Sequence, residues 1–257
     1  MAGFLIVNAD DWGRDAETTA RILDCVQTGA VSSVSAMVFM EDSARAAALA
    51  RGYGIDAGLH LNLTTTFSAA TCPRGLVDRQ EDIARYLRRG RFAAVAVHPG
   101  LRRAFEYVVE AQVDEFRRLY GSEPERIDGH HHAHLCANVR LQRLLPKGAL
   151  VRRNFSFQAG EKGVWNRWYR RVVDRSLARR HRLEDFFFSL TPLEPVSRLG
   201  RIVSLARQFA VEVGTHPAKP DEYRFLQGGE IFRHVGDVPI VPHSVVLARG
   251  RSGWAEE

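Results

Sequence analysis

Short apolar segments alternate with amphipathic segments along most of this chain, and this alternation is the feature that most limits its fold. The segments that we expect to form strands lie at residues 4–8, 33–39, 56–63, 126–128, 150–151, 186–190 and 211–215, and 238–241 is a further candidate. Apolar residues at helical spacing occur between these runs, in segments 15–29, 42–52, 101–120 and 196–209. Strands separated by helices predict βαβ units and a mostly parallel sheet, which is the α/β fold class.

A single domain is expected over residues 1–257. A chain of 257 residues fits one or two domains on length alone. The sequence has no internal repeat at a fixed period, no low-complexity segment and no recognisable linker, so we expect one unit. The connection 64–100 is long, and we expect it to carry a short helix at 80–88 and to help build a substrate site, as long loops after parallel strands often do.

Positive charge is concentrated in one segment of the chain. The net charge is +6, and residues 164–182 hold seven arginines and one acid, Asp174, which leaves 29 basic and 29 acidic residues elsewhere. A protein that binds nucleic acid would carry a broad basic surface, so we do not expect nucleic acid as a partner.

The same segment carries apolar residues at helical spacing, which are Trp165, Trp168, Tyr169, Val172, Val173 and Leu177. A basic amphipathic helix of this kind touches either a membrane or an anionic substrate. The other interpretation is a surface helix whose apolar stripe faces the core, and we favour it because helices of globular proteins have the same pattern. Peripheral membrane contact through residues 164–182 is the alternative.

The cysteines and the first residues predict a cytoplasmic protein. The three cysteines, Cys25, Cys72 and Cys136, cannot all pair with one another and none lies in a CxxC motif, so we expect reduced thiols. The chain begins without the basic region and the long apolar run of a secretory leader. The sequence has no run of 18 or more apolar residues, so we expect no membrane-spanning helix. The pattern leaves the oligomeric state open, a homo-oligomer included.

Polar and ionisable residues gather at the carboxyl ends of the predicted strands. The residues that share this placement are Asn8, Asp10, Asp11, His60, Asn62, Asp128, His130, His131, His132, His134, Arg152 and His216. In a parallel α/β protein these strand ends point to one face, and that face holds the active site. Their convergence from distant positions predicts a catalytic or binding site.

Two adjacent carboxylates, Asp10 and Asp11, come directly after the first strand. Because side chains alternate along a strand, the two carboxylates are expected to point in different directions. One could bind a metal while the other acts as a base, and the alternative is an ordinary turn or helix start.

Four histidines follow the fourth strand, at His130, His131, His132 and His134. Imidazole is a common ligand of zinc and similar ions, whereas a solvent-exposed histidine-rich turn is the alternative. One ion cannot use all four, so the remaining histidines are expected to touch substrate or to orient the ligands.

Two further histidines lie at strand ends. His60 shares a strand face with Asn62, and we interpret it as a metal ligand rather than as a structural histidine. His216 precedes Pro217 at a step from strand to loop, where it is either a loop histidine or a general acid with a pKa near neutrality.

Four motifs in order then match one family. Residues 5–13, with Asn-Ala-Asp-Asp-Trp-Gly, resemble the NADDFG signature of the YdjC-like (ChbG/HpnK) carbohydrate deacetylases. Residues 58–64 are similar to its GLHLNLT strand, 127–134 to its DSHHHVH and 212–217 to its final E-x-M-x-H-P-G. The motifs fall within residues 5–217, and the tail 220–257 matches the family poorly.

The resemblance implies a distorted NodB-like (β/α) barrel with mostly parallel strands. It also implies a hydrolase that acts on a linear amide C–N bond, removing acetyl from an N-acetylated sugar with one divalent metal ion. Carried over by motif position, Asp11, His60 and His130 should hold the metal, Asp10 should be the general base and His216 the general acid. The residues expected to support these or to bind substrate are Asn62, Asp128, His132, His134 and Arg152, the last by positioning Asp10.

The family is usually described with magnesium (Mg²⁺), and this is our expected cofactor. Two nitrogens and one carboxylate also suit zinc (Zn²⁺), nickel, cobalt or iron, which are the alternatives. The sequence departs from the family at Trp12 for Phe, Gly129 for Ser and Ala218 for Gly. These changes bear on substrate choice more than on metal binding.

Two other functions compete with a deacetylase. A metal-dependent phosphoesterase also uses His and Asp at strand ends, but it normally needs more than one ion. A non-catalytic protein that binds a glycan or a lipid-linked sugar is the third interpretation. Both Asp10 and His216 are present, and binding alone needs neither a base nor an acid, so we favour the enzyme. The sequence leaves the sugar open.

Overall fold

The structure, a computed structural model, describes residues 3–157 and 161–248. The strands are β1 Phe4–Trp12, β2 Ser33–Ala36, β3 Ala57–Leu61, β4 Arg126–Gly129, β5 Leu150–Val151, β6 Phe186–Ser189 and β7 Ala210–Thr215. The α-helices are α1 Ala16–Gln27, α2 Ser43–Tyr53, α3 Arg74–Leu87, α4 Arg91–Val95, α5 Arg102–Tyr120, α6 Ala137–Leu141, α7 Val164–Ala178, α8 Val196–Ala206, α9 Pro220–Gln227, α10 Glu230–Val235 and α11 Ser244–Ala248. Two 3₁₀ helices are η1 Pro99–Leu101 and η2 His130–Leu135.

Two compact units make up the described chain. Unit 1 contains the described parts of 1–10, 20–34 and 150–257, and unit 2 contains 11–19 and 35–149. The chain passes from one unit to the other within β1, between Asp10 and Asp11, and again within β2. The two adjacent aspartates therefore belong to different units.

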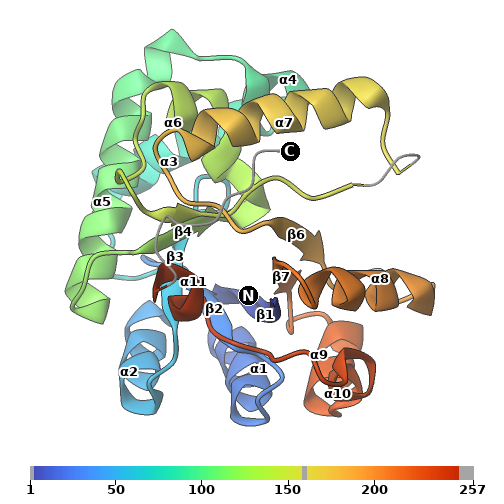
Figure 1. Cartoon of the computed structure of the whole chain (residues 1–257). Coiled ribbons are helices and arrows are strands. Elements are labelled where there is room, and N and C mark those ends of the chain that lie inside the picture. Colours follow the sequence, from blue (N-terminus) through green and yellow to red (C-terminus); the bar gives the residue numbers. More distant parts are fainter. Residues whose placement is uncertain (1–2, 158–160, 249–257) are drawn as a thin grey trace. The chain divides into compact units, whose positions relative to one another are not determined.

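In unit 1, strand β7 lies between β1 and β6, and both pairings are parallel. Asn8 is opposite Gly214 and Ala9 is opposite Thr215. The strands are rich in Val, Ile and Phe, which suits strands covered on both faces, and every residue of β1 and β7 is buried. Helix α8 packs against β7 and brings Leu199 and Ile202 into the core (Figure 1).

In unit 2, strand β3 pairs with β4 in parallel, and His60 lies opposite Asp128. Helix α5 packs against α2 and α3 (Figure 1). Its buried stripe keeps the 3.6-residue period, with Phe105, Val108, Val109, Gln112, Phe116 and Leu119. The helix ends at Gly121, whose left-handed φ of 75° terminates it as the sequence predicts.

These pairings confirm the predicted α/β fold class with parallel strands. Several details differ from the sequence prediction, among them β2, which ends at Ala36 rather than at residue 39. Strand β1 continues to Trp12, and the long connection carries α3 from residue 74, earlier than expected, followed by α4 and η1. Segment 238–241 forms only an isolated bridge, Ile240 with Leu5, because Pro239 lacks the N–H that a strand would donate. The single domain over 1–257 stays a prediction.

The side chains that α7 buries differ in part from the sequence prediction. The sequence favoured an apolar stripe that faces the core, and Val173 and Leu177 are indeed buried. Trp165 and Trp168, by contrast, are 81% and 58% exposed. The buried stripe is narrower than the apolar pattern predicts, and Asp174, which is hydrogen-bonded to Asn154, shares the buried side of the helix. None of the described helices is both long enough and apolar enough to cross a membrane.

Candidate functional site

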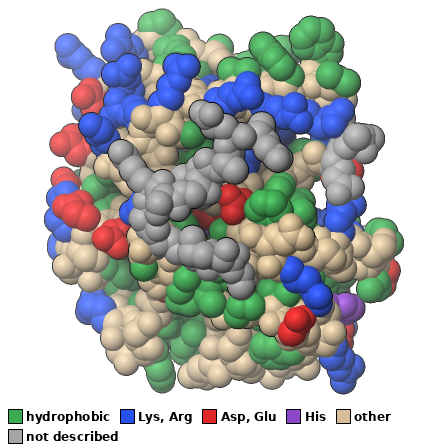
Figure 2. Space-filling model, viewed as in Figure 1, with side chains coloured by type: hydrophobic (Ala, Val, Ile, Leu, Met, Phe, Trp, Pro, Cys, Tyr) green, Lys and Arg blue, Asp and Glu red, His purple; other side chains and the backbone are tan. Residues whose placement is uncertain are grey.

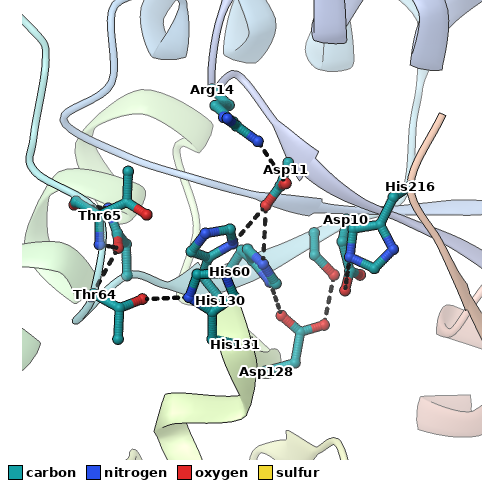
Figure 3. Close-up of polar contacts among 12 residues, drawn as sticks. Asp10, Asp11, Arg14, His60, Thr64, Thr65, Asp128, His130, His131 and His216 are labelled. Atoms are coloured by element: carbon teal, nitrogen blue, oxygen red, sulfur yellow. Dashed lines mark hydrogen bonds and ion pairs between the residues drawn. The ribbon is translucent and has the colours of Figure 1, made fainter. Parts of the chain in front are cut away.

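In unit 2, Asp11 meets two histidines that come from distant parts of the sequence (Figure 3). Its Oδ1 lies 2.8 Å from Nδ1 of His130 and 3.3 Å from Nε2 of His60. All three side chains are buried. Asp11, the second-last residue of β1, has a left-handed φ of 70°, which Asp tolerates better than most residues.

His60 is oriented by Asp128 on the neighbouring strand. The Asp128 carboxylate lies 2.6 Å from Nδ1 of His60, so this nitrogen carries the proton and Nε2 is left facing Asp11. Asp128 is itself held by Ser35, which donates from 2.5 Å, and by Arg126, at 3.1 Å. The parallel register of β3 and β4 produces the contact, because it sets His60 beside Asp128.

The Asp11, His60 and His130 side chains fit a divalent metal ion. Each offers one ligand atom, and the three atoms lie within 4.8 Å of one another. A carboxylate oxygen and two imidazole nitrogens suit zinc and related transition ions, and three protein ligands leave positions open for reactants. Burial by itself would raise the pKa of Asp11, but hydrogen bonds and charge from His130 and His60 outweigh it and hold that pKa far below its usual range.

The rest of the histidine cluster occupies the turn η2. His131 and His132 have left-handed φ values of 53° and 55°, so the chain bends sharply directly after the metal-cluster histidine, His130. The ring of His131 reaches back to the Thr64 hydroxyl at 3.0 Å (Figure 3). His134 is fully buried, as His60 nearly is.

Asn62 shapes the loop after β3. Its amide donates to the Thr65 carbonyl at 2.7 Å, and its oxygen accepts from the backbone N–H groups of Thr64 and Thr65. Gln112 of α5 accepts from the Asn62 backbone at 2.7 Å. The hydrogen bonds of the buried Asn62 side chain stabilise this turn. The turn places the Thr64 hydroxyl next to His131.

In unit 1, Arg152 binds both oxygens of the Asp10 carboxylate. The two hydrogen bonds are 2.8 Å each, and Asn8 donates a third of 2.8 Å to Asp10. Arg152 is 1% exposed, and its guanidinium lies over the Phe187 ring. The two aspartates thus have different partners, as the alternation of side chains along a strand predicts.

A further buried network extends from Arg152. Glu212 of β7 accepts from Arg152 at 2.8 Å. His243 lies between two glutamates, with Nε2 3.3 Å from Glu184 and 3.8 Å from Glu212. Burial opposes the ionised form of Glu212, but the positive charge of Arg152 and the contact with His243 prevail and lower its pKa. The alternating charges allow several ionisable groups to be buried together.

His216 lies at the end of β7, with Nε2 3.7 Å from Asp10. Its side chain is 34% exposed, so it contacts both the buried Asp10 carboxylate and solvent. The loop that carries it is fixed by Glu222, which accepts from the His216 backbone N–H at 2.6 Å and from Thr191 at 2.8 Å. Glu222 is fully buried.

Seven of the sequence-predicted residues fall into these two clusters. Unit 2 brings together Asp11, His60, Asp128 and His130, and unit 1 brings together Asp10, Arg152 and His216. His132 and His134 lie in the η2 turn, with ring centroids 6.4 Å apart.

Sequence reasoning did not identify Ser35, Arg126, Glu184, Glu222 and His243. The signal that could have indicated Arg126 is a charged residue beside apolar Ile127 in a predicted buried strand, since such a charge needs a partner. Glu222 and His243 lie in the tail 220–257, where no motif pointed to them. Residues from 249 onward in that tail lie outside the described residues.

Comparison with known proteins adds a family match. A family model described as YdjC-like protein matches residues 4–237. A chitooligosaccharide deacetylase of Serratia marcescens is 35% identical over 144 residues, covering 54% of this chain and 53% of that protein. A carbohydrate deacetylase of Danio rerio is 33% identical over 138 residues, covering 53% of this chain and 44% of that protein. The chain spans about half the length of the curated relatives it matches.

Among solved structures, a crystal structure from Enterococcus faecalis described as a "putative cellobiose-phosphate cleavage protein" has a similar fold. The TM-score is 0.66 and the match covers 96% of this chain and 99% of that one. Sequence identity is 16%, so the likeness concerns the fold alone.

Proposed function

The chain belongs to the family of YdjC-like proteins, and we propose that it is a metal-dependent hydrolase that removes acetyl from an N-acetylated sugar. One observation carries the proposal. Two consecutive aspartates have opposite surroundings, since Asp11 contacts two histidines and Asp10 contacts Arg152 and His216. Amide hydrolysis needs both kinds of site, one that activates the carbonyl and one that moves protons. The names of the two curated relatives support this choice.

Asp11, His60 and His130 would hold the divalent ion. An ion bound there supplies Lewis-acid activation of the acetyl carbonyl and of the attacking water. Asp128 serves this set by keeping His60 in one tautomer and one orientation. We propose Mg²⁺ or a transition ion such as Zn²⁺ as the cofactor, and the two-nitrogen donor set favours the transition ion.

Asp10 would act as the general base and take a proton from the water that attacks the acetyl carbon. Arg152 contributes by positioning, since its two parallel hydrogen bonds fix the plane of the carboxylate and favour its ionised form. A planar guanidinium leaves the remaining lone pairs of Asp10 available, so the base can still accept a proton.

His216 would act as the general acid. When the C–N bond of the amide breaks, the departing nitrogen needs a proton, and the partly exposed imidazole of His216 can donate it. Water adds to the acetyl carbon, the nitrogen leaves with the electron pair of the broken bond, and the products are acetate and a free amino sugar. Binding of the sugar is proposed to involve the connection 64–100. Cytoplasmic localisation stays a prediction.

Acetate release tests the proposal. The full chain is incubated with N-acetylated sugars, from the monosaccharide to chitooligosaccharides and a lipid-linked example, with added divalent metal or with chelator. We expect acetate from at least one sugar with metal and none with chelator, and one ion per chain in metal analysis. Two ions per chain together with phosphate release from sugar phosphates would instead support the phosphoesterase. One tightly bound ion with no acetate from any sugar would favour a binding protein.

A further inference from the structure

The helix α7 presents an outward face that combines aromatic and basic side chains. Residues spaced three and four apart share this face, and they are Val164, Trp165, Trp168, Arg171, Val172 and Arg175, which we call the α7 outer face. All six are exposed, and Trp165 and Val164 are 81% and 70% exposed. The buried side of the helix, with Val173 and Leu177, lies opposite. A helix with this division has one face in the protein and one available to a partner.

Exposure of the Trp165 and Trp168 side chains to water is energetically unfavourable. Large aromatic side chains are rarely left in water, and these two are neighbours with ring centroids 6.2 Å apart in an edge-on arrangement. Their exposure is not balanced by acidic neighbours, because the one acid of segment 164–182, Asp174, lies on the buried side and binds Arg153. Arg171 and Arg175 have no ion pair among the described residues.

We propose that the α7 outer face docks on the surface of an anionic lipid bilayer. Tryptophan prefers the boundary between lipid tails and headgroups, and arginine prefers the phosphates just outside it. Figure 2 shows a row of Lys and Arg side chains over α7, with hydrophobic side chains at the surface beside it. The aromatic residues lie in the first half of the helix and Arg171 and Arg175 follow, so the helix can lie flat with both groups at headgroup depth.

The charge argues against a second copy of this chain as the occupant. A symmetric contact between two α7 outer faces would bring Arg171 and Arg175 of both copies together without acids to pair with them. Nucleic acid is also disfavoured, because the basic residues outside 164–182 are matched by acids. An anionic bilayer satisfies both the aromatic and the basic side chains.

Sedimentation with vesicles tests the proposal on the full chain. Vesicles of phosphatidylcholine alone are compared with vesicles that also contain phosphatidylglycerol, at low and at high salt. We expect binding to the anionic vesicles only, reduced by salt, together with a blue shift of tryptophan fluorescence. The test needs no enzymatic activity, so it is independent of the proposed reaction.

Two double variants locate the contact. Trp165→Ala with Trp168→Ala should weaken vesicle binding by at least ~10-fold, because the buried apolar area is lost. Arg171→Gln with Arg175→Gln should weaken it and reduce its dependence on salt. Tyr53→Ala with Phe92→Ala removes two aromatic side chains that are 60% and 85% exposed elsewhere, and should leave binding unchanged.

Three results would overturn the proposal. The first is absence of binding to anionic vesicles at low salt by a protein with a normal unfolding transition. The second is binding that neither α7 variant weakens. The third is self-association of the wild-type chain that the tryptophan variant abolishes, which would assign the face to a second copy.

Discussion

Nδ1 of His60 lies 2.6 Å from the carboxylate of Asp128, a residue 68 positions later in the chain. The contact spans two neighbouring parallel strands, so it depends on their register and not on any local motif. It fixes the tautomer of His60 and directs Nε2 toward Asp11. The metal affinity of the proposed site should therefore depend on Asp128, a residue outside the proposed set of metal ligands.

Asp128→Asn should weaken divalent metal binding by ~10- to 100-fold, because it removes the charge that orients and polarises His60. Metal affinity is measured by calorimetric titration of the metal-free chain with Zn²⁺. Asp114→Asn changes an exposed carboxylate that also binds an arginine, and it should bind Zn²⁺ as the wild type does. Wild-type affinity in Asp128→Asn would contradict the orienting role.

Asp10→Asn should reduce turnover by ~10²- to 10⁴-fold while metal affinity stays close to that of the wild type, since the amide cannot accept the proton of water. Steady-state acetate release and metal titration on the same preparation separate the two effects. Asp42→Asn is the matched control, because Asp42 is also a buried carboxylate held by an arginine, Arg45. Full turnover by Asp10→Asn would rule out its role as the base.

His216→Asn should lower amide hydrolysis by ~10²-fold or more and lower hydrolysis of an acetyl ester of an acidic phenol much less. The phenolate can leave without being protonated, whereas the amine must accept a proton as the C–N bond breaks. The ratio of the two rates in wild type and variant is the measurement. Equal losses on both substrates would indicate that His216 positions the site and donates no proton.

Glu212→Gln should lower the free energy of unfolding by ~1–3 kcal/mol near neutral pH, because it removes one of the two buried carboxylates beside Arg152 and the more distant of the two beside His243. The pKa of Glu212 is lower in the folded state than its ordinary value of 4.5. Its stabilising contribution is therefore complete above about pH 4.5 and is lost as pH falls through the folded-state pKa.

Denaturant unfolding of wild type and Glu212→Gln across this pH range measures the difference. It should be constant from neutral pH down to about pH 5.5 and should shrink below about pH 4.5. The exposed Glu123→Gln, which loses a partner of Arg117, serves as the surface comparison. If the difference in the free energy of unfolding between wild type and Glu212→Gln grew as the pH fell, the predicted direction of the pH dependence would be wrong.

Gly129→Ala should destabilise the chain by ~1–3 kcal/mol and disturb the η2 turn. A Cβ atom at Gly129 would lie 2.9 Å from the backbone nitrogen of His134, so the turn must move. Gly200→Ala in α8 has open space around the new Cβ and should be neutral or stabilising by ~0.5–1 kcal/mol. Thermal unfolding midpoints of Gly129→Ala and Gly200→Ala are compared. Equal midpoints would mean that the η2 turn rearranges with no loss of stability.

The periodicity of the sequence predicted most of the fold. Helix α5 and strands β6 and β7 carry uninterrupted patterns, and their bounds lie within one residue of the expected ones. Helix α7 shows where periodicity is insufficient. Trp165 and Val173 contribute equally to an apolar pattern, but only packing decides that one is exposed and the other buried.

The candidate site was predictable where residues lie at strand ends or in motifs. Asp10, Asp11 and His60 follow from those patterns. Glu222 and His243 do not, because each acts through a contact made by folding: Glu222 with the His216 backbone, and His243 with Glu184. A single sequence contains no sign of such contacts between distant segments.

Residues 8–11 cannot absorb an insertion or a deletion, because β1 is fixed in register against β7. Asn8 faces Gly214 and Ala9 faces Thr215. One extra residue before Asp10 would move every following side chain to the opposite side of the strand, and the two aspartates would exchange surroundings. Evolution of this stretch is therefore restricted to replacement of one amino acid by another, while changes in chain length must be taken up by connections such as 64–100.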